Sequence, residues 1–130
     1  MAKRKTVLNV SRILVAADDP EVGNLFARKL QSTRYSVSEA KSGAETLRLL
    51  RSMRFQVLVL DLDMPDTDGF EVLKVVKTKH PSVRVLAISG YRNGALLEAA
   101  RCLGAAFGLC RTSAPGLLVE TVRKLLGESR

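Results

Sequence analysis

Short apolar runs alternate with longer segments along most of this chain. The runs predict strands at 13–17, 35–40, 57–60, 83–88 and 106–110. In the segment after each run, apolar residues recur every three or four positions, which predicts one helix after each strand. Strands that alternate with helices form a parallel sheet joined by right-handed crossovers. The pattern therefore predicts an α/β domain with a doubly wound, five-stranded parallel sheet and five helices, in three αβα layers.

Capping signals mark where several of these helices begin and end. Asp19 precedes Pro20, which is a strong start signal for the first helix. Ser42 and Asp68 each stand three positions before a Glu, the spacing of a capping box. Gly104 predicts the end of the helix that begins near residue 95. Asp19 therefore has a structural interpretation as a helix cap beside any functional one.

The predicted strand at 57–60 is apolar at every position, as expected for a strand buried on both faces. It runs directly into Asp61, and a carboxylate there is costly to bury unless a cation lies beside it. Polar residues follow most of the other strands as well. They are Asp18 and Asp19 after the first strand, Asp63 together with Asp61 after the third, Ser89 after the fourth and Arg111 after the fifth.

The carboxyl ends of parallel strands meet at one edge of a sheet, so these polar residues are expected to converge. A cluster of carboxylates offers the oxygen ligands that Mg²⁺ prefers. A carboxylate beside such an ion can also attack phosphorus and form an aspartyl phosphate. Arg111 would then neutralise charge on the phosphoryl oxygens, and Ser89 could donate a hydrogen bond to one of them.

The charge balance describes a basic body with a concentrated acidic spot. The 130 residues include 21 Lys and Arg against 13 Asp and Glu, a formal net charge of +8. Six of the acids fall in just two segments, 18–19 and 61–68. A basic body can attract nucleic acid or acidic proteins, or it can serve solubility alone. No direct nucleic-acid binding is expected, because aromatic residues are not interleaved with the bases.

No apolar run is long enough to span a bilayer, and the basic amino-terminus is not followed by a signal-peptide core. The sequence therefore predicts a cytoplasmic protein that does not bind membranes. Cys102 and Cys110 lack the spacing of a metal site and stand among apolar residues. They are expected to be two reduced thiols in the core.

Taken together, several motifs resemble the receiver domain of bacterial response regulators, with its CheY-like, flavodoxin-like (βα)5 fold. They are Asp18-Asp19, Asp61-Leu62-Asp63-Met64-Pro65-Asp66-Thr67-Asp68-Gly69, Ala87-Ile88-Ser89-Gly90 and Gly104-Ala105. The resemblance predicts a receiver domain at 12–127, and the clustered bases before it predict a basic arm at 1–11, with a short tail at 128–130. No DNA-binding module follows residue 126, so a stand-alone receiver in a two-component phosphorelay is expected.

The resemblance also implies a role for each site residue. Asp61 would be the phosphoacceptor, and Ser89 the switch hydroxyl. Mg²⁺ would be held by Asp19, Asp61 and the backbone carbonyl of Asp63, with Asp18 acting through water. The phosphoryl group would come from a histidine kinase, a phosphotransfer protein or a small acyl phosphate. Such a protein is not an enzyme beyond phosphoryl transfer to and from its own aspartate.

The resemblance further implies an output surface made by the helix near 95–103, the strand at 106–110 and the last helix. A downstream protein would bind there, and the chain is expected to be a monomer or a weak homodimer. Two positions near this surface depart from the family pattern. Arg111-Thr112 stands where Lys-Pro is usual, and Gly108 stands where an aromatic residue is usual, with Phe107 one position earlier and therefore on the other side of the strand.

Two alternative functions remain open at this point. A degenerate receiver could act as a protein-interaction module without phosphorylation, and Gly108 and Arg111 favour that interpretation. Its docking surface would be the apolar helix that begins near residue 95. Alternatively, Leu60-Asp61-Leu62-Asp63 resembles the Asp-x-Asp motif of haloacid-dehalogenase-type phosphatases. In that family, however, a Thr or Val stands at the position of Pro65.

Overall fold

The computed structural model describes residues 10–64, 69–90 and 94–128. Its five strands are β1 (Arg12–Ala16), β2 (Ser36–Ala40), β3 (Val57–Asp61), β4 (Arg84–Ser89) and β5 (Phe107–Cys110). The helices between and after them are α2 (Pro20–Gln31), α3 (Gly43–Ser52), α4 (Gly69–Lys79), α5 (Ala95–Cys102) and α6 (Ala114–Leu125). The strands are all parallel, in the order β2-β1-β3-β4-β5. The predicted doubly wound sheet is confirmed.

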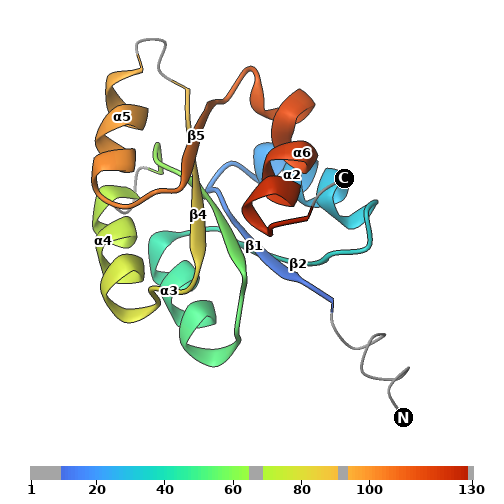
Figure 1. Ribbon diagram of the computed structural model, residues 1–130, viewed down its shortest axis with the longest axis horizontal. Helices are drawn as coiled ribbons and strands as arrows, with labels where there is room; N and C mark the ends of the chain where they lie inside the picture. Colours follow the sequence, from blue (N-terminus) through green and yellow to red (C-terminus); the bar gives the residue numbers. More distant parts are fainter. Residues whose placement is uncertain (1–9, 65–68, 91–93, 129–130) are drawn as a thin grey trace.

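The helices form two layers that cover opposite faces of the sheet (Figure 1). One core lies between the sheet and α3, α4 and α5, and the other lies between the sheet and α2 and α6. Strand β3 has the central position and contributes alternate residues to the two cores, with Leu58 and Leu60 in the first and Val57 and Val59 in the second. Each such side chain stabilises the fold by about 1.5–3 kcal/mol of apolar burial. This burial holds β3 in place, and β3 carries Asp61 as its last residue.

The helix starts follow the capping signals. Asp19 is the N-cap of α2, and its Oδ1 accepts a hydrogen bond from the Glu21 amide at 2.9 Å. Ser42 caps α3 in the same way, with its Oγ accepting from the Glu45 amide at 3.0 Å. The cap expected at Asp68 lies outside the described residues, as does most of the basic arm. Gly104 follows α5 with a φ of +115°, a conformation that favours glycine.

The prediction that both cysteines lie in the core is wrong. Cys102 is exposed. It lies on α5, and among the residues of this helix only Ala100 is fully buried. Cys110 is half-buried, because β5 is an edge strand with a neighbour on one side only. Within the described part of the chain, neither cysteine forms a disulfide. Among the same residues, no helix has the length and apolar character needed to cross a bilayer.

Candidate functional site

The carboxyl-terminal edge of the sheet gathers three of the predicted site residues. Asp61 ends β3, Ser89 ends β4, and Arg111 follows β5 directly. The backbone ties these ends together, since the Leu62 amide donates to the Ile88 carbonyl and the Arg111 amide donates to the Ser89 carbonyl, both at 2.8 Å. Asp61 and Ser89 are both buried, with about 1% of their surface exposed. The convergence expected from the strand order is therefore present.

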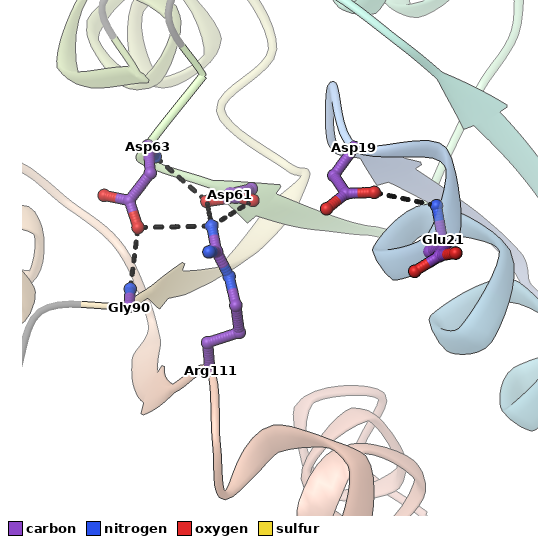
Figure 2. A network of polar contacts seen from close by, with 6 residues as sticks. All are labelled: Asp19, Glu21, Asp61, Asp63, Gly90 and Arg111. Atoms are coloured by element: carbon purple, nitrogen blue, oxygen red, sulfur yellow. Dashed lines mark hydrogen bonds and ion pairs between the residues drawn. The ribbon is translucent and has the colours of Figure 1, made fainter.

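Arg111 reaches across this edge and binds two carboxylates with one nitrogen (Figure 2). Its Nη2 donates to Asp61 Oδ1 at 3.0 Å and Oδ2 at 2.7 Å, and it lies 3.2 Å from Asp63 Oδ2. Its Nε is buried and has no hydrogen-bond partner among the described residues. The guanidinium thus approaches the carboxylates end-on, through one of its donors, and neutralises a charge that would be costly to bury alone.

The side chain of Asp63 belongs to this site, as the carboxylate cluster predicted, although the family resemblance implied a role only for its backbone carbonyl. Its Oδ2 accepts from the Gly90 amide at 2.7 Å, and its own amide donates to Asp61 Oδ1 at 2.9 Å. The carboxylate therefore joins the segment after β3 to the segment after β4. Gly90 permits this approach, because a Cβ there would lie 3.2 Å from Arg111 Nη1 and 3.3 Å from Asp63 Oδ2. The only sequence signal for this contact was a carboxylate two positions after Asp61.

Burial dominates the electrostatics of Asp61. It raises the pKa of this carboxyl above the ordinary value, and the nearby negative charge of Asp63 acts in the same direction. The hydrogen bond from the Asp63 amide and the positive charge of Arg111 lower the pKa and offset only part of the rise. Burial is therefore the main cause of the raised pKa of Asp61.

The two acids after β1 lie at the neighbouring position along the same edge, because β1 pairs with β3 in parallel register. Asp18 is half-buried and Asp19 is exposed. One oxygen of Asp19 caps α2, so its structural role is confirmed, and Figure 2 shows its carboxylate on the same edge as Asp61. The structure thus places Asp18 and Asp19 beside the Arg111 cluster but does not include them in it.

The donor chemistry of this edge fits a hard divalent cation, since every candidate ligand is an oxygen. Among the described residues, however, no three His, Cys, Asp or Glu side chains lie close enough together to hold a metal ion. Arg111 supplies the positive charge that compensates the carboxylates of Asp61 and Asp63. A cation at Asp61 would therefore share these oxygens with the guanidinium.

The second departure from the family pattern also has a structural consequence. Gly108 faces α5, and a Cβ at this position would lie 3.2 Å from both Cβ and Cδ2 of Leu97. The side chain of Leu97 thus occupies the space that a larger residue at 108 would need. Phe107 points away from that contact, as the alternation of the strand predicted, and it is 42% exposed.

Comparisons with known proteins agree with this geometry. The sequence model of the response regulator receiver domain matches residues 13–123. The chain is 33% identical over 85 residues to the sensor kinase CckA of Brucella abortus, covering 64% of this chain but only 9% of that protein. It is 29% identical over 87 residues to the response regulator receiver protein CpdR of the same organism, covering 67% of this chain and 72% of CpdR.

A solved structure shows the same arrangement of elements. It is the response regulator protein TrrA of Thermotoga maritima in complex with Mg²⁺ and beryllium fluoride, at 26% identity and a TM-score of 0.80. The superposition covers 89% of this chain and 99% of that one.

Proposed function

The chain belongs to the response regulator receiver domain family, and from that premise we propose that Asp61 is its phosphoacceptor. Members of this family accept a phosphoryl group on an aspartate in two-component signalling. The family is a signalling module and not a conventional class of enzyme. One observation supports Asp61 above the other acids: it is a buried carboxylate at the end of the central strand, in contact with a cation.

The proposed reaction is attack by an Asp61 carboxylate oxygen on the phosphorus of the donor. A new O–P bond forms while the bond from phosphorus to the donor's nitrogen or oxygen breaks, and the donor leaves with that electron pair. Arg111 stabilises the charge on the transferred oxygens from its place beside Asp61. Ser89, buried at the end of β4, is proposed to donate its hydroxyl to a phosphoryl oxygen.

Receiver domains bind Mg²⁺ in general. In this chain Asp19, Asp61 and the backbone carbonyl of Asp63 are proposed to hold it, with Asp18 acting through water. The ion would supply positive charge that draws in the donor phosphate and lowers the barrier to transfer. Asp63 gives Arg111 a second carboxylate to contact, so the guanidinium can turn from Asp61 without losing its charged partner.

Receiver domains interact with histidine kinases and phosphotransfer proteins, which are the proposed phosphodonors here. We propose that α5, β5 and α6 form the output face for a downstream protein. Phe107, the first residue of β5, is 42% exposed, and Leu103, directly after α5, is 40% exposed. Both present apolar surface to a partner. We further propose that the receiver domain spans residues 12–127 and that the protein is a cytoplasmic monomer or weak homodimer.

A second candidate function is supported by the contact between Gly108 and Leu97. An aromatic residue that alternates between two positions with phosphorylation is absent at 108, and Leu97 fills the space beside it. This favours a receiver that acts as a protein-interaction module without switching. The family match, in contrast, gives no support to the phosphatase interpretation.

Incubation with Mg²⁺ and acetyl phosphate, followed by intact-mass measurement, tests the proposed function. We expect the gain of one phosphoryl group, absent from the Asp61→Asn variant. Binding of a beryllium fluoride mimic with Mg²⁺ is expected to require Asp61 in the same way. If neither phosphorylation nor binding of the mimic occurs in the native chain, the interaction-module function is favoured instead.

A further inference from the structure

The edge of the sheet opposite Asp61 contains a groove lined by basic residues, on the lower side of the molecule in Figure 1, where α3 and α4 lead into β3 and β4. Two adjoining hollows of about 460 and 270 Å³ form it, and they share Arg54, Phe55 and Ser82. The exposed bases along them, termed the basic groove, are Arg51, Arg54, Lys79 and Arg84. Neither set of lining residues includes an Asp or a Glu.

The charges of the basic groove are not compensated within the described residues. By contrast, Arg48 on α3 lies 3.7 Å from Glu45, and Lys74 on α4 lies 3.5 Å from Glu71. None of the four groove bases lies within 4.0 Å of a described carboxylate. Four cations without a carboxylate partner among the described residues therefore line this groove, at the edge of the sheet opposite the acidic site.

Helix ends explain part of this cluster. Arg51 and Lys79 fall in the last turns of α3 and α4, where a cation favours the helix dipole. Arg84 donates to the Leu125 carbonyl at the end of α6. Arg54, however, lies on no helix, and the helix ends do not account for a groove without acids. Four like charges side by side repel one another unless an anion lies between them.

We propose that the basic groove binds an acidic segment of a partner polypeptide. Arginine binds carboxylates through a planar fork of donors, so Asp or Glu side chains suit these positions. Met53, Val83 and Leu126 add aliphatic surface to the lining, and Ser52 and Ser82 add hydroxyl groups. The proposed occupant is an extended peptide that presents carboxylates to the bases.

The same lining disfavours nucleic acid as the occupant. Proteins that hold single strands stack the bases on exposed aromatic rings. The lining holds two aromatic side chains, Phe55, which is only 2% exposed, and His80, which is half-buried. The groove therefore offers charge and aliphatic contact but little aromatic surface for stacking.

Peptide binding at this edge does not require phosphorylation at Asp61. The basic groove is therefore a second site, beyond the proposed function. The two sites lie at opposite ends of the strands and share no residue. A chain in which Asp61 fails to accept a phosphoryl group would still bind an acidic peptide. Failure of one proposal is thus distinguishable from failure of the other.

Fluorescence anisotropy with a labelled synthetic peptide of alternating Glu and Ala tests the proposal on the full chain. A peptide of alternating Gln and Ala and a labelled DNA duplex serve as comparison probes. The test variant is Arg51→Gln with Arg54→Gln. The matched control is Lys41→Gln with Lys74→Gln, which removes the same net charge from exposed positions outside the groove. Circular dichroism of each variant verifies that the fold is retained.

The native chain is expected to bind the Glu peptide in a salt-dependent manner and to ignore the Gln peptide. Two exposed charges contribute together about two- to thirtyfold in affinity, so the groove variant should weaken binding by that factor while the control remains close to native. Equal weakening in both variants would mean general charge attraction and would overturn the assignment. Absence of peptide binding at low salt would do the same, as would tighter, groove-dependent binding of the DNA duplex.

Discussion

Replacing Arg111 with Met removes the only cation that contacts Asp61 within the described residues. The Asp61 side chain is 2% exposed, so water cannot take over the role of the guanidinium. Asp63 retains its hydrogen bond from Gly90, and the Asp63 amide still donates to Asp61. The substitution therefore removes the contacts of Arg111 with both carboxylates, Asp61 and Asp63, and leaves these backbone hydrogen bonds in place.

The size of the effect follows from the unequal exposure of the pair. Breaking a fully buried pair costs about 3–5 kcal/mol because a charge is left uncompensated, whereas an exposed pair contributes about 0.2–1 kcal/mol. Asp61 is buried, but the Arg111 side chain is 35% exposed and partly screened by solvent. An intermediate loss of about 1.5–3 kcal/mol in the free energy of unfolding is expected at neutral pH.

The loss should depend on pH in a defined direction. Arg111 lowers the pKa of Asp61, so its removal lets the pKa of this buried carboxyl rise further in the folded state. The unfolded chain keeps an ordinary Asp pKa of about 3.9. The destabilisation is therefore complete above the folded-state pKa of the variant. It shrinks as the pH falls, and it disappears once Asp61 is protonated in both proteins.

Urea unfolding followed by circular dichroism at several pH values measures this effect. The matched control is Arg48→Met, because Arg48 is 61% exposed and its partner Glu45 lies 3.7 Å away. The control should lose less than about 1 kcal/mol. Asp61→Asn completes a double-mutant cycle with Arg111→Met, and the coupling between the two sites should account for most of the loss. A destabilisation that does not change with pH, or a coupling near zero, would refute the ion-pair explanation.

Three further substitutions have expected outcomes. In urea titrations, Asp61→Asn should be more stable than the native chain at pH 7, because the raised pKa of Asp61 means that its charged form destabilises the fold. This advantage should disappear as the pH falls and Asp61 of the native chain becomes protonated. Gly69→Ala should destabilise by about 1–3 kcal/mol or more in the same titration, since its Cβ would lie 2.7 Å from the Leu62 Cα and backbone cannot move aside as a side chain can. Gly108→Phe should lower the Tm, and adding Leu97→Ala should restore part of the loss; a Tm unchanged by Gly108→Phe would contradict the contact with Leu97.

The sequence predicted the features of this fold that depend on local pattern and parallel topology. The apolar run before Asp61 indicated a strand buried on both faces, and a central strand in a doubly wound sheet has that burial. The convergence of Asp61, Ser89 and Arg111 followed from the rule that parallel strands end at one edge. These inferences needed no knowledge of loop geometry, which is why they are confirmed.

Features that depend on how a side chain leaves its element could not be predicted in the same way. The bond between Asp63 Oδ2 and the Gly90 amide joins residues 27 positions apart in two loops, and no periodic pattern encodes it. The exposure of Cys102 depends on how α5 is rotated on the sheet, and small residues such as those at 99 and 100 leave that rotation ambiguous in the sequence. Leu117, part of the apolar pattern of the last helix, is 44% exposed for a similar reason.

The topological rule that located the acidic site also applies to the opposite edge. Residues that follow parallel strands meet at one end of the sheet, so residues that precede or begin them must meet at the other. Arg12 begins β1, Arg84 begins β4, and Arg54 precedes β3 by three positions. The net charge of +8 is a sum over the whole chain and therefore does not show that the two edges differ in charge. Sorting charges by their place before or after a strand puts Asp61 and Arg54 at opposite edges of the sheet, with Arg111 after β5 as a cation at the acidic edge.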